Sequence, residues 1–127
     1  MINMPESAEN YLETIYVLSR NGNPVRATDI ANALGYSKPS VSIALKNLRE
    51  SKHVTVNGGH ILLTASGRAV AESVHERHVV ISGWLISMGV EASTAHADAC
   101  KIEHVLSEQS FTAIKQYLKE HNSCKHS

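Results

Sequence analysis

The chain has 127 residues, which is enough for one compact domain or two small ones and too few for a large enzyme. Hydrophobic residues make up 43% of it and charged residues 19%, an ordinary balance for a globular protein. No apolar run approaches the roughly 20 residues that span a bilayer, and the amino terminus lacks the basic start and apolar core of a signal peptide. Two cysteines are too few for a disulfide scaffold. We therefore expect a cytoplasmic protein with no membrane partner.

The formal net charge is zero, which argues against a protein that coats nucleic acid by electrostatics alone. The charges are nevertheless unevenly placed. Residues 24–68 carry six basic and two acidic side chains, a local net charge of +4, so the rest of the chain is acidic by the same amount. Contact with nucleic acid is therefore expected in this segment.

The amino-terminal part predicts three helices in succession. Apolar residues recur at helical spacing over residues 5–20, and an Asn-Gly-Asn-Pro run ends this helix because proline cannot continue one. A short helix over residues 27–34 ends at Gly35. The third helix opens with Ser37 as its cap and Pro39 in its first turn. Two helices joined by a tight glycine turn are typical of a helix-turn-helix motif.

A hairpin is predicted directly after these helices. Two β-rich runs, at residues 53–56 and 60–64, flank an Asn-Gly-Gly sequence. Asparagine and glycine tolerate positive φ, so this sequence favours a hairpin turn. A hairpin that follows the second helix of the pair predicts the winged form of the helix-turn-helix.

The second half of the chain predicts helices alone. Its apolar spacing indicates a long helix over about residues 64–88, which Gly89 ends, and two further helices over residues 92–106 and 107–121. The sequence therefore predicts a mainly α fold, with a winged helix-turn-helix first and a helical region after it.

The second helix of the pair carries polar and basic side chains at the positions where a winged helix-turn-helix reads DNA. Serine hydroxyls and backbone amides at a helix start suit phosphate oxygens, and Pro39 or Ile43 suits thymine methyl groups. A capped helix start with a solvated basic face gives the same pattern, but the hairpin and the basic segment favour DNA. The candidate DNA-binding residues are Arg26, Ser37, Lys38, Pro39, Ser40, Ser42, Lys46 and Arg49.

The stretch HADACKIEHVLS, at residues 96–107, combines several types of metal ligand. His96, Cys100, Glu103 and His104 stand at i, i+4, i+7 and i+8, which places them on one stripe of a helix. Thiolate, carboxylate and imidazole together suit Fe²⁺, Zn²⁺, Co²⁺ or Mn²⁺ rather than Ca²⁺ or Mg²⁺. The stripe therefore predicts a metal-binding face, with another helix completing the ligand set.

Two other predicted helices offer such ligands, although each residue alone has an ordinary structural explanation. A histidine at a helix interface is commonly a hydrogen-bonded core residue, acids spaced i, i+4 are usually solvated, and a lone cysteine is usually a small buried apolar residue. The coincidence of ligand types on three helices favours a metal site. The candidates are Glu9, Asn10 and Glu13 on the first helix and His75 and His78 on the long one; His75, His121, His126 and Cys124 gain no further support and are expected at the surface.

The sequence resembles the metal-dependent transcriptional repressors of the diphtheria toxin repressor and manganese transport regulator type. Such a resemblance implies a cytoplasmic bacterial homodimer that binds palindromic, double-stranded operator DNA when loaded with ferrous or manganous ion and represses metal-uptake genes. We expect the short form of this family, without the SH3-like domain of the longer iron-dependent members. Four stretches carry it: AENYLETIYVL (8–18), VRATDIANALGYSKPSVS (25–42), LTASGRAVAE (63–72) and HADACKIEHVLS (96–107).

The resemblance also implies a ligand set. Cys100, Glu103 and His104 match primary-site ligands. Glu13 matches an acidic ligand of the manganese branch, and His78 and His96 match further ligand positions. Three residues depart from the family pattern. Asn10 replaces methionine or aspartate, Ser82 replaces a glutamate of the ancillary site in the iron branch, and Ile43 replaces a polar residue of the recognition helix.

We therefore expect a winged helix-turn-helix DNA-binding domain over residues 1–72 and a helical dimerisation and metal-binding domain over residues 73–127. The expected ion is Fe(II), with Mn(II) second and Zn(II) or Co(II) as substitutes in vitro. It is expected to crosslink the first helix, through Glu13 and the weaker donor Asn10, to the face formed by Cys100, Glu103 and His104.

Two other classes of protein remain. One is a winged-helix regulator whose effector is not a metal. The other is a small metalloenzyme, but the sequence contains no nucleophile motif and no phosphate-binding loop. We expect no enzymatic activity and no small-molecule substrate.

Overall fold

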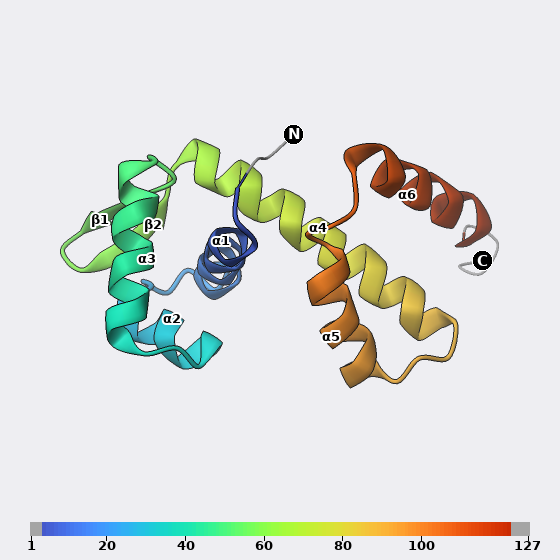
Figure 1. The fold of residues 1–127 in the computed structure, drawn as a ribbon, viewed down its shortest axis with the longest axis horizontal. Coiled ribbons are helices and arrows are strands. Elements are labelled where there is room, and N and C mark those ends of the chain that lie inside the picture. The colour runs from blue at the N-terminus through green and yellow to red at the C-terminus, as the bar shows by residue number, and fades with distance from the viewer. Residues whose placement is uncertain (1–3, 123–127) are drawn as a thin grey trace. The chain divides into compact units, whose positions relative to one another are not determined.

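The computed structural model describes residues 4–122, which form six helices and one two-stranded antiparallel sheet (Figure 1). Cys124 and His126 lie outside the described residues. Within the described part, no helix is both long and apolar enough to cross a membrane. The elements are α1 (Glu6–Ser19), α2 (Ala27–Leu34), α3 (Lys38–Glu50), β1 (Val54–Asn57), β2 (His60–Leu63), α4 (Ala65–Ser87), α5 (Ala92–Ile102) and α6 (Glu108–Asn122). The predicted mainly α fold with a winged helix-turn-helix is confirmed.

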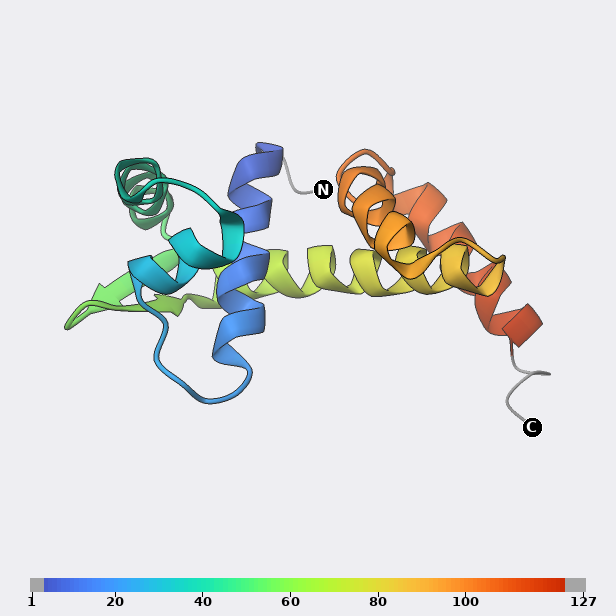
Figure 2. The same cartoon turned by 90° about the horizontal axis from the view of Figure 1, so that it is seen from below.

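The chain divides into two compact units, one ending at Val74 and the other beginning at His75. The long helix α4 contributes to both, because its 23 residues run through this boundary without interruption (Figure 2).

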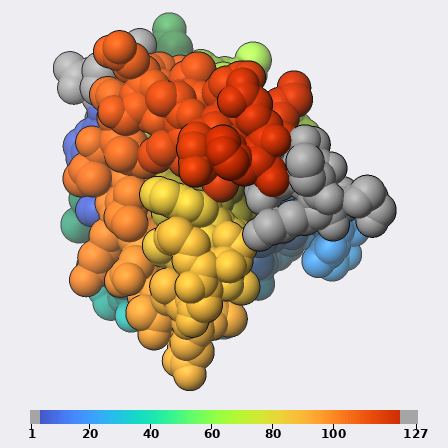
Figure 3. Space-filling model, turned by 90° about the vertical axis from the view of Figure 1, so that its right-hand side faces the viewer, coloured from blue at the N-terminus to red at the C-terminus, as the bar shows by residue number. Residues whose placement is uncertain are grey.

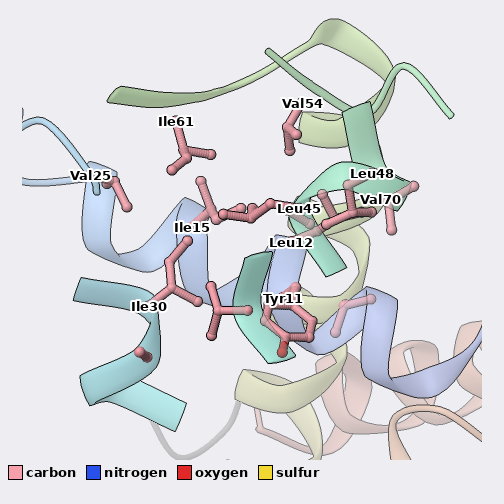
Figure 4. Close-up of a cluster of buried hydrophobic side chains, with 14 residues drawn as sticks. Tyr11, Leu12, Ile15, Val25, Ile30, Leu45, Leu48, Val54, Ile61 and Val70 are labelled. Atoms are coloured by element: carbon pink, nitrogen blue, oxygen red, sulfur yellow. The ribbon is translucent and has the colours of Figure 1, made fainter. Parts of the chain in front are cut away.

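A hydrophobic core holds the amino-terminal unit together (Figure 4). It draws apolar residues from α1, α2, α3, the hairpin and the start of α4. Leu12 and Ile15 of α1, three residues apart, are fully buried, and Val41 and Leu45 of α3, four residues apart, are buried as well. Each fully buried aliphatic side chain stabilises the fold by about 1.5–3 kcal/mol. This shared core fixes the side of α3 that remains exposed.

The turn between α2 and α3 has the chemistry that the sequence predicts. Gly35 ends α2 with a φ of 71°, a left-handed conformation that glycine adopts without a Cβ clash. Ser37 then caps α3, where its Oγ accepts a hydrogen bond from the Ser40 amide at 3.3 Å. The start of α3 is therefore held by local interactions.

The hairpin pairs Val54 with Leu63 and Asn57 with His60, and both turn glycines have positive φ. It is joined to the chain segment before α2 at two points. The Ile61 amide donates to the Val25 carbonyl at 2.8 Å, and Nη2 of Arg26 lies 3.1 Å from Nε2 of His60. The wing is therefore anchored next to the helix-turn-helix.

The carboxy-terminal unit contains the rest of α4 together with α5 and α6, which share the face seen in Figure 3. Ile81, Ala95, Ala99 and Phe111 are its buried apolar residues. The helix predicted over residues 92–106 is wrong at its end, because α5 stops at Ile102. From there the chain turns with short-range hydrogen bonds, such as the Val105 amide to the Ile102 carbonyl at 3.0 Å.

Candidate metal centre and DNA-binding helix

Glu103 is the most deeply buried charged residue of the carboxy-terminal unit, with only 1% of its surface exposed. Its Oε1 lies 2.9 Å from Nδ1 of His78 on α4, and its Oε2 lies 3.4 Å from Nε2 of His104. The His104 side chain is itself only 3% exposed. Burial of a carboxylate is costly unless charged or hydrogen-bonding groups surround it, and here two imidazoles do so.

His78 joins this carboxylate to a third imidazole. Its Nε2 lies 3.1 Å from Nδ1 of His96 on α5, and the two rings are nearly parallel, with centroids 5.3 Å apart. A carboxylate only accepts hydrogen bonds, so in neutral His78 the proton belongs on Nδ1 and Nε2 accepts from His96. One carboxylate and three imidazoles therefore form a connected set of nitrogen and oxygen donors.

Ser82 lies one turn after His78 on α4 and is buried. Its hydroxyl donates to the His78 carbonyl at 2.7 Å. This back-bonding to the helix is a common role for a buried serine. The position therefore supplies no carboxylate to the cluster.

Cys100, Glu13 and Asn10 are the other predicted ligands. Cys100 is exposed on the last turn of α5, and Glu103 and His104 follow the end of that helix rather than continuing it. Glu13 and Asn10 are half-buried on α1, in the amino-terminal unit. Within the carboxy-terminal unit, the structure brings together His78, His96, Glu103 and His104.

Sequence reasoning missed Arg77, which precedes His78 on α4. Its guanidinium donates to the carbonyl oxygens of Glu103 at 3.1 Å and Leu106 at 2.6 Å. No sequence motif marks this arginine, and its two carbonyl partners lie 26 and 29 residues away in sequence. The local sequence therefore does not predict this interaction.

The α3 helix presents one apolar and one polar face. Val41, Leu45 and Leu48 are buried, whereas the candidate DNA-binding residues of α3 are exposed: Lys38, Pro39, Ser40, Ser42, Lys46 and Arg49. Ile43 lies on the same exposed face, with 63% of its surface exposed. Arg26 differs from the other candidates, because its guanidinium contacts His60 of the wing.

Comparison with known families assigns each half of the chain. The family model described as iron dependent repressor, N-terminal DNA binding domain, matches residues 3–59. The one described as iron dependent repressor, metal binding and dimerisation domain, matches residues 64–127. The chain belongs to the iron-dependent repressor family. This confirms the resemblance found in the sequence, and members of this family are repressors rather than enzymes.

Among the relatives of this chain, some are named for iron and others for manganese. Transcriptional regulator MntR of Escherichia coli is 31% identical over 119 residues, which cover 93% of this chain and 77% of MntR. Iron-dependent repressor IdeR of Mycobacterium tuberculosis is 37% identical over 111 residues, covering 85% of this chain and 48% of IdeR. The structure of the manganese regulator SloR matches with a TM-score of 0.81 at 28% identity, over 91% of this chain and 55% of that one. The chain thus spans about half the length of IdeR and SloR.

Each candidate site lies in the part of the chain that matches the family model for that function. The α3 helix is within the part that matches the DNA-binding model. The cluster around Glu103 is within the part that matches the metal-binding and dimerisation model.

Proposed function

We propose that this chain is a metal-activated transcriptional repressor that binds palindromic operator DNA as a homodimer and controls metal-uptake genes. Fe²⁺ is the proposed activating ion, and Mn²⁺ is the second candidate. The observation that carries the proposal is the buried Glu103 carboxylate, whose oxygens lie 2.9 Å from a His78 nitrogen and 3.4 Å from a His104 nitrogen.

The donor types around Glu103 fit a divalent transition-metal ion. Carboxylate and imidazole bind Fe²⁺, Mn²⁺ and Zn²⁺, and two of the three imidazoles contact the carboxylate directly. When bound, such an ion supplies positive charge to the buried carboxylate and holds its ligands in one arrangement. We propose as ligands Glu103, His104, Cys100, His78, His96 and Glu13, with Asn10 as a weaker donor.

The choice between the two ions depends on Cys100. A thiolate is a softer ligand than a carboxylate, so a site that includes Cys100 favours Fe²⁺ over Mn²⁺. A site formed by carboxylate and imidazole groups alone suits Mn²⁺ equally well. Comparing Cys100→Ser with the wild type therefore tests the preference directly: a larger loss with Fe²⁺ than with Mn²⁺ supports Fe²⁺.

DNA binding is assigned to the exposed face of α3. In a dimer, two such helices read half-sites about one helical turn, roughly 10 base pairs, apart. An ion that limits the arrangements available to the dimer reduces the ordering cost of binding DNA. By linkage, DNA must then tighten metal binding by the same factor.

The test is selection of binding sites from a random pool of double-stranded DNA. It is performed without oxygen, in parallel with Fe²⁺, Mn²⁺, Zn²⁺ and a chelator. We expect a palindromic motif that is enriched with Fe²⁺ or Mn²⁺ and absent with chelator. Equal enrichment with chelator would leave a winged-helix regulator with a non-metal effector, and no enrichment in any condition would overturn DNA binding itself.

Two variants connect the selection to the metal site. Glu103→Gln should abolish the metal-dependent enrichment, whereas Glu91→Gln, at the exposed start of α5, should retain it. On α1, Glu13→Gln should weaken activation, and Glu6→Gln, exposed in the first turn of the same helix, should not. Unchanged metal dependence in Glu103→Gln would contradict the proposed site.

A further inference from the structure

Arg77 contacts the turn after α5 and the start of α6 with a single guanidinium group. Nη1 donates to the carbonyl oxygens of Glu103 and Leu106, at 3.1 and 2.6 Å, and Nη2 donates to Oε1 of Glu108 at 2.9 Å. The group also lies over the buried ring of Phe111, 5.0 Å from its centroid. Only 12% of the Arg77 side chain is exposed.

We propose that Arg77 is the positioning residue of the metal centre, because it clamps the turn that carries Glu103 and His104. This inference rests on the proposed function, since it assigns those two side chains to the metal. Arg77 itself is not a ligand, because a guanidinium stays protonated and offers no lone pair.

The clamp acts where the backbone has lost its helical partners. The helix α5 ends at Ile102, and its last carbonyl groups accept hydrogen bonds from amides of the following turn, whereas the carbonyl groups of Glu103 and Leu106 accept from Arg77. Arg77 supplies donors to two carbonyl groups of this segment. A cation at a helix carboxyl end is also favoured by the helix dipole. The premature end of α5 and the Arg77 contacts are therefore parts of one arrangement.

Arg77 and its neighbour His78 hold the same residue at two points. Arg77 binds the backbone carbonyl of Glu103, and His78 lies 2.9 Å from its carboxylate. Both residues belong to α4, a helix of 23 residues. Contacts from one rigid helix therefore fix the orientation of the Glu103 side chain. Residues outside the ligand shell commonly orient metal ligands in this way.

The geometry requires arginine rather than another cation. The planar guanidinium meets two carbonyl groups, a carboxylate and an aromatic ring at once, whereas a lysine ammonium is a point charge without that fork. Lys115 provides the matched control within the same unit. It also lies over Phe111, at 5.3 Å, and pairs with Glu76 at 2.9 Å, and neither of these contacts is with the turn.

The first test needs no metal and measures amide hydrogen exchange in the full-length apo protein. The amides of residues 103–106 donate to carbonyl groups at the end of α5 and should exchange at least about 10-fold faster in Arg77→Met than in the wild type. Amides in the middle of α4, around Ile81, should change much less. Lys115→Met should leave the turn unchanged. Equal acceleration throughout the unit would show a general loss of stability and overturn the clamp.

The second test measures Co²⁺ binding and its visible absorption spectrum at a temperature where all variants are folded. Arg77→Met should weaken Co²⁺ binding about 10- to 100-fold and alter the absorption bands, as loss of an outer support does. Arg77→Lys should restore only part of the affinity, and Lys115→Met should match the wild type. A wild-type spectrum and affinity in Arg77→Met would overturn the positioning role.

The two tests separate this inference from the proposed function. If the wild type binds neither Co²⁺ nor Mn²⁺, the metal function fails and the assigned role of Arg77 toward the ion fails with it. In that case, hydrogen exchange alone tests whether Arg77 holds the turn. If the wild type binds metal and Arg77→Met binds it equally well, only the positioning role fails.

Discussion

The carbonyl oxygen of His53 approaches Gly67 so closely that a Cβ at position 67 would lie 1.9 Å from it. Gly67 is buried in the first turn of α4, and His53 precedes β1. Thr64 fixes the same junction, because its hydroxyl accepts from the Gly67 amide at 3.1 Å and donates to the Lys52 carbonyl at 2.7 Å. The wing and α4 therefore meet through backbone contact that only glycine permits.

We predict that Gly67→Ala destabilises the protein by about 1–3 kcal/mol or more, because backbone must move to admit the methyl group. Urea unfolding at one fixed protein concentration measures the effect. Gly83→Ala is the control, since it lies in the same helix and, apart from its chain neighbours and the adjacent helix backbone, no atom is within 4 Å of an added Cβ. That change should be neutral or should stabilise by up to about 1 kcal/mol. Equal effects of the two substitutions would contradict the close approach.

Ile43 is predicted to influence which operator sequence is preferred. It is 63% exposed on the face of α3 that carries the basic residues, so it contributes little to the core and is available to a thymine methyl group. Ile43→Gln should change base preference by about 1–3 kcal/mol at one position per half-site, with unfolding stability within about 0.5 kcal/mol of the wild type. Site selection and urea unfolding measure the two quantities.

The matched control on the same helix is Lys46→Ala. An exposed lysine that neutralises a phosphate should weaken binding to all sequences about equally and lower the salt dependence by roughly one charge. Titration of DNA at several salt concentrations distinguishes the two variants. If Ile43→Gln also weakened all sequences equally, Ile43 would not read bases.

Metal binding is predicted to stabilise the folded protein. An ion that binds only the folded state raises the free energy of unfolding by about 2.7 kcal/mol at 100 times its Kd. Thermal unfolding with and without Mn²⁺, at one protein concentration, measures this shift. Glu103→Gln should lose it and Glu91→Gln should keep it. Equal shifts in both variants would place the stabilising ion at some other site.

The elements that sequence predicts well are those fixed by neighbouring residues. The start of α3 follows from Ser37, and its buried stripe follows from the spacing of Val41 and Leu45, so both were predictable. The end of α5 was not, because residues 92–106 are all compatible with a helix. It coincides with contacts from Arg77, which is 26 residues from Glu103 in sequence. Interactions between distant segments leave no periodic pattern.

The candidate site divides in the same way. Helical spacing singled out His96, Glu103 and His104 as candidates, but it placed them on one stripe of a continuous helix. In the structure, Glu103 is buried and His104 follows it in a turn, while Cys100 stays exposed on α5. Burial depends on what packs against a residue, and sequence spacing alone does not contain that information.

Tyr11 is predicted to make stability fall at alkaline pH. Burial raises the pKa of its phenol above the ordinary value of about 10, and the nearby Tyr36, with ring centroids 5.8 Å apart, raises it further. Above about pH 10 the unfolded chain therefore loses this proton before the folded protein does. Because the folded state then binds more protons, the free energy of unfolding decreases as the pH rises, by at most about 1.4 kcal/mol per pH unit.

Urea unfolding between pH 8 and pH 11 tests this dependence, read as the difference between variants so that other titrating groups cancel. Tyr11→Phe should lose less stability above pH 10 than the wild type, and Tyr36→Phe should show a smaller change in the same direction. Tyr117→Phe, exposed on α6, should follow the wild type. If the curves of Tyr11→Phe and the wild type ran parallel through pH 11, burial would not be opposing ionisation of Tyr11, and another group would have to account for any alkaline loss of stability.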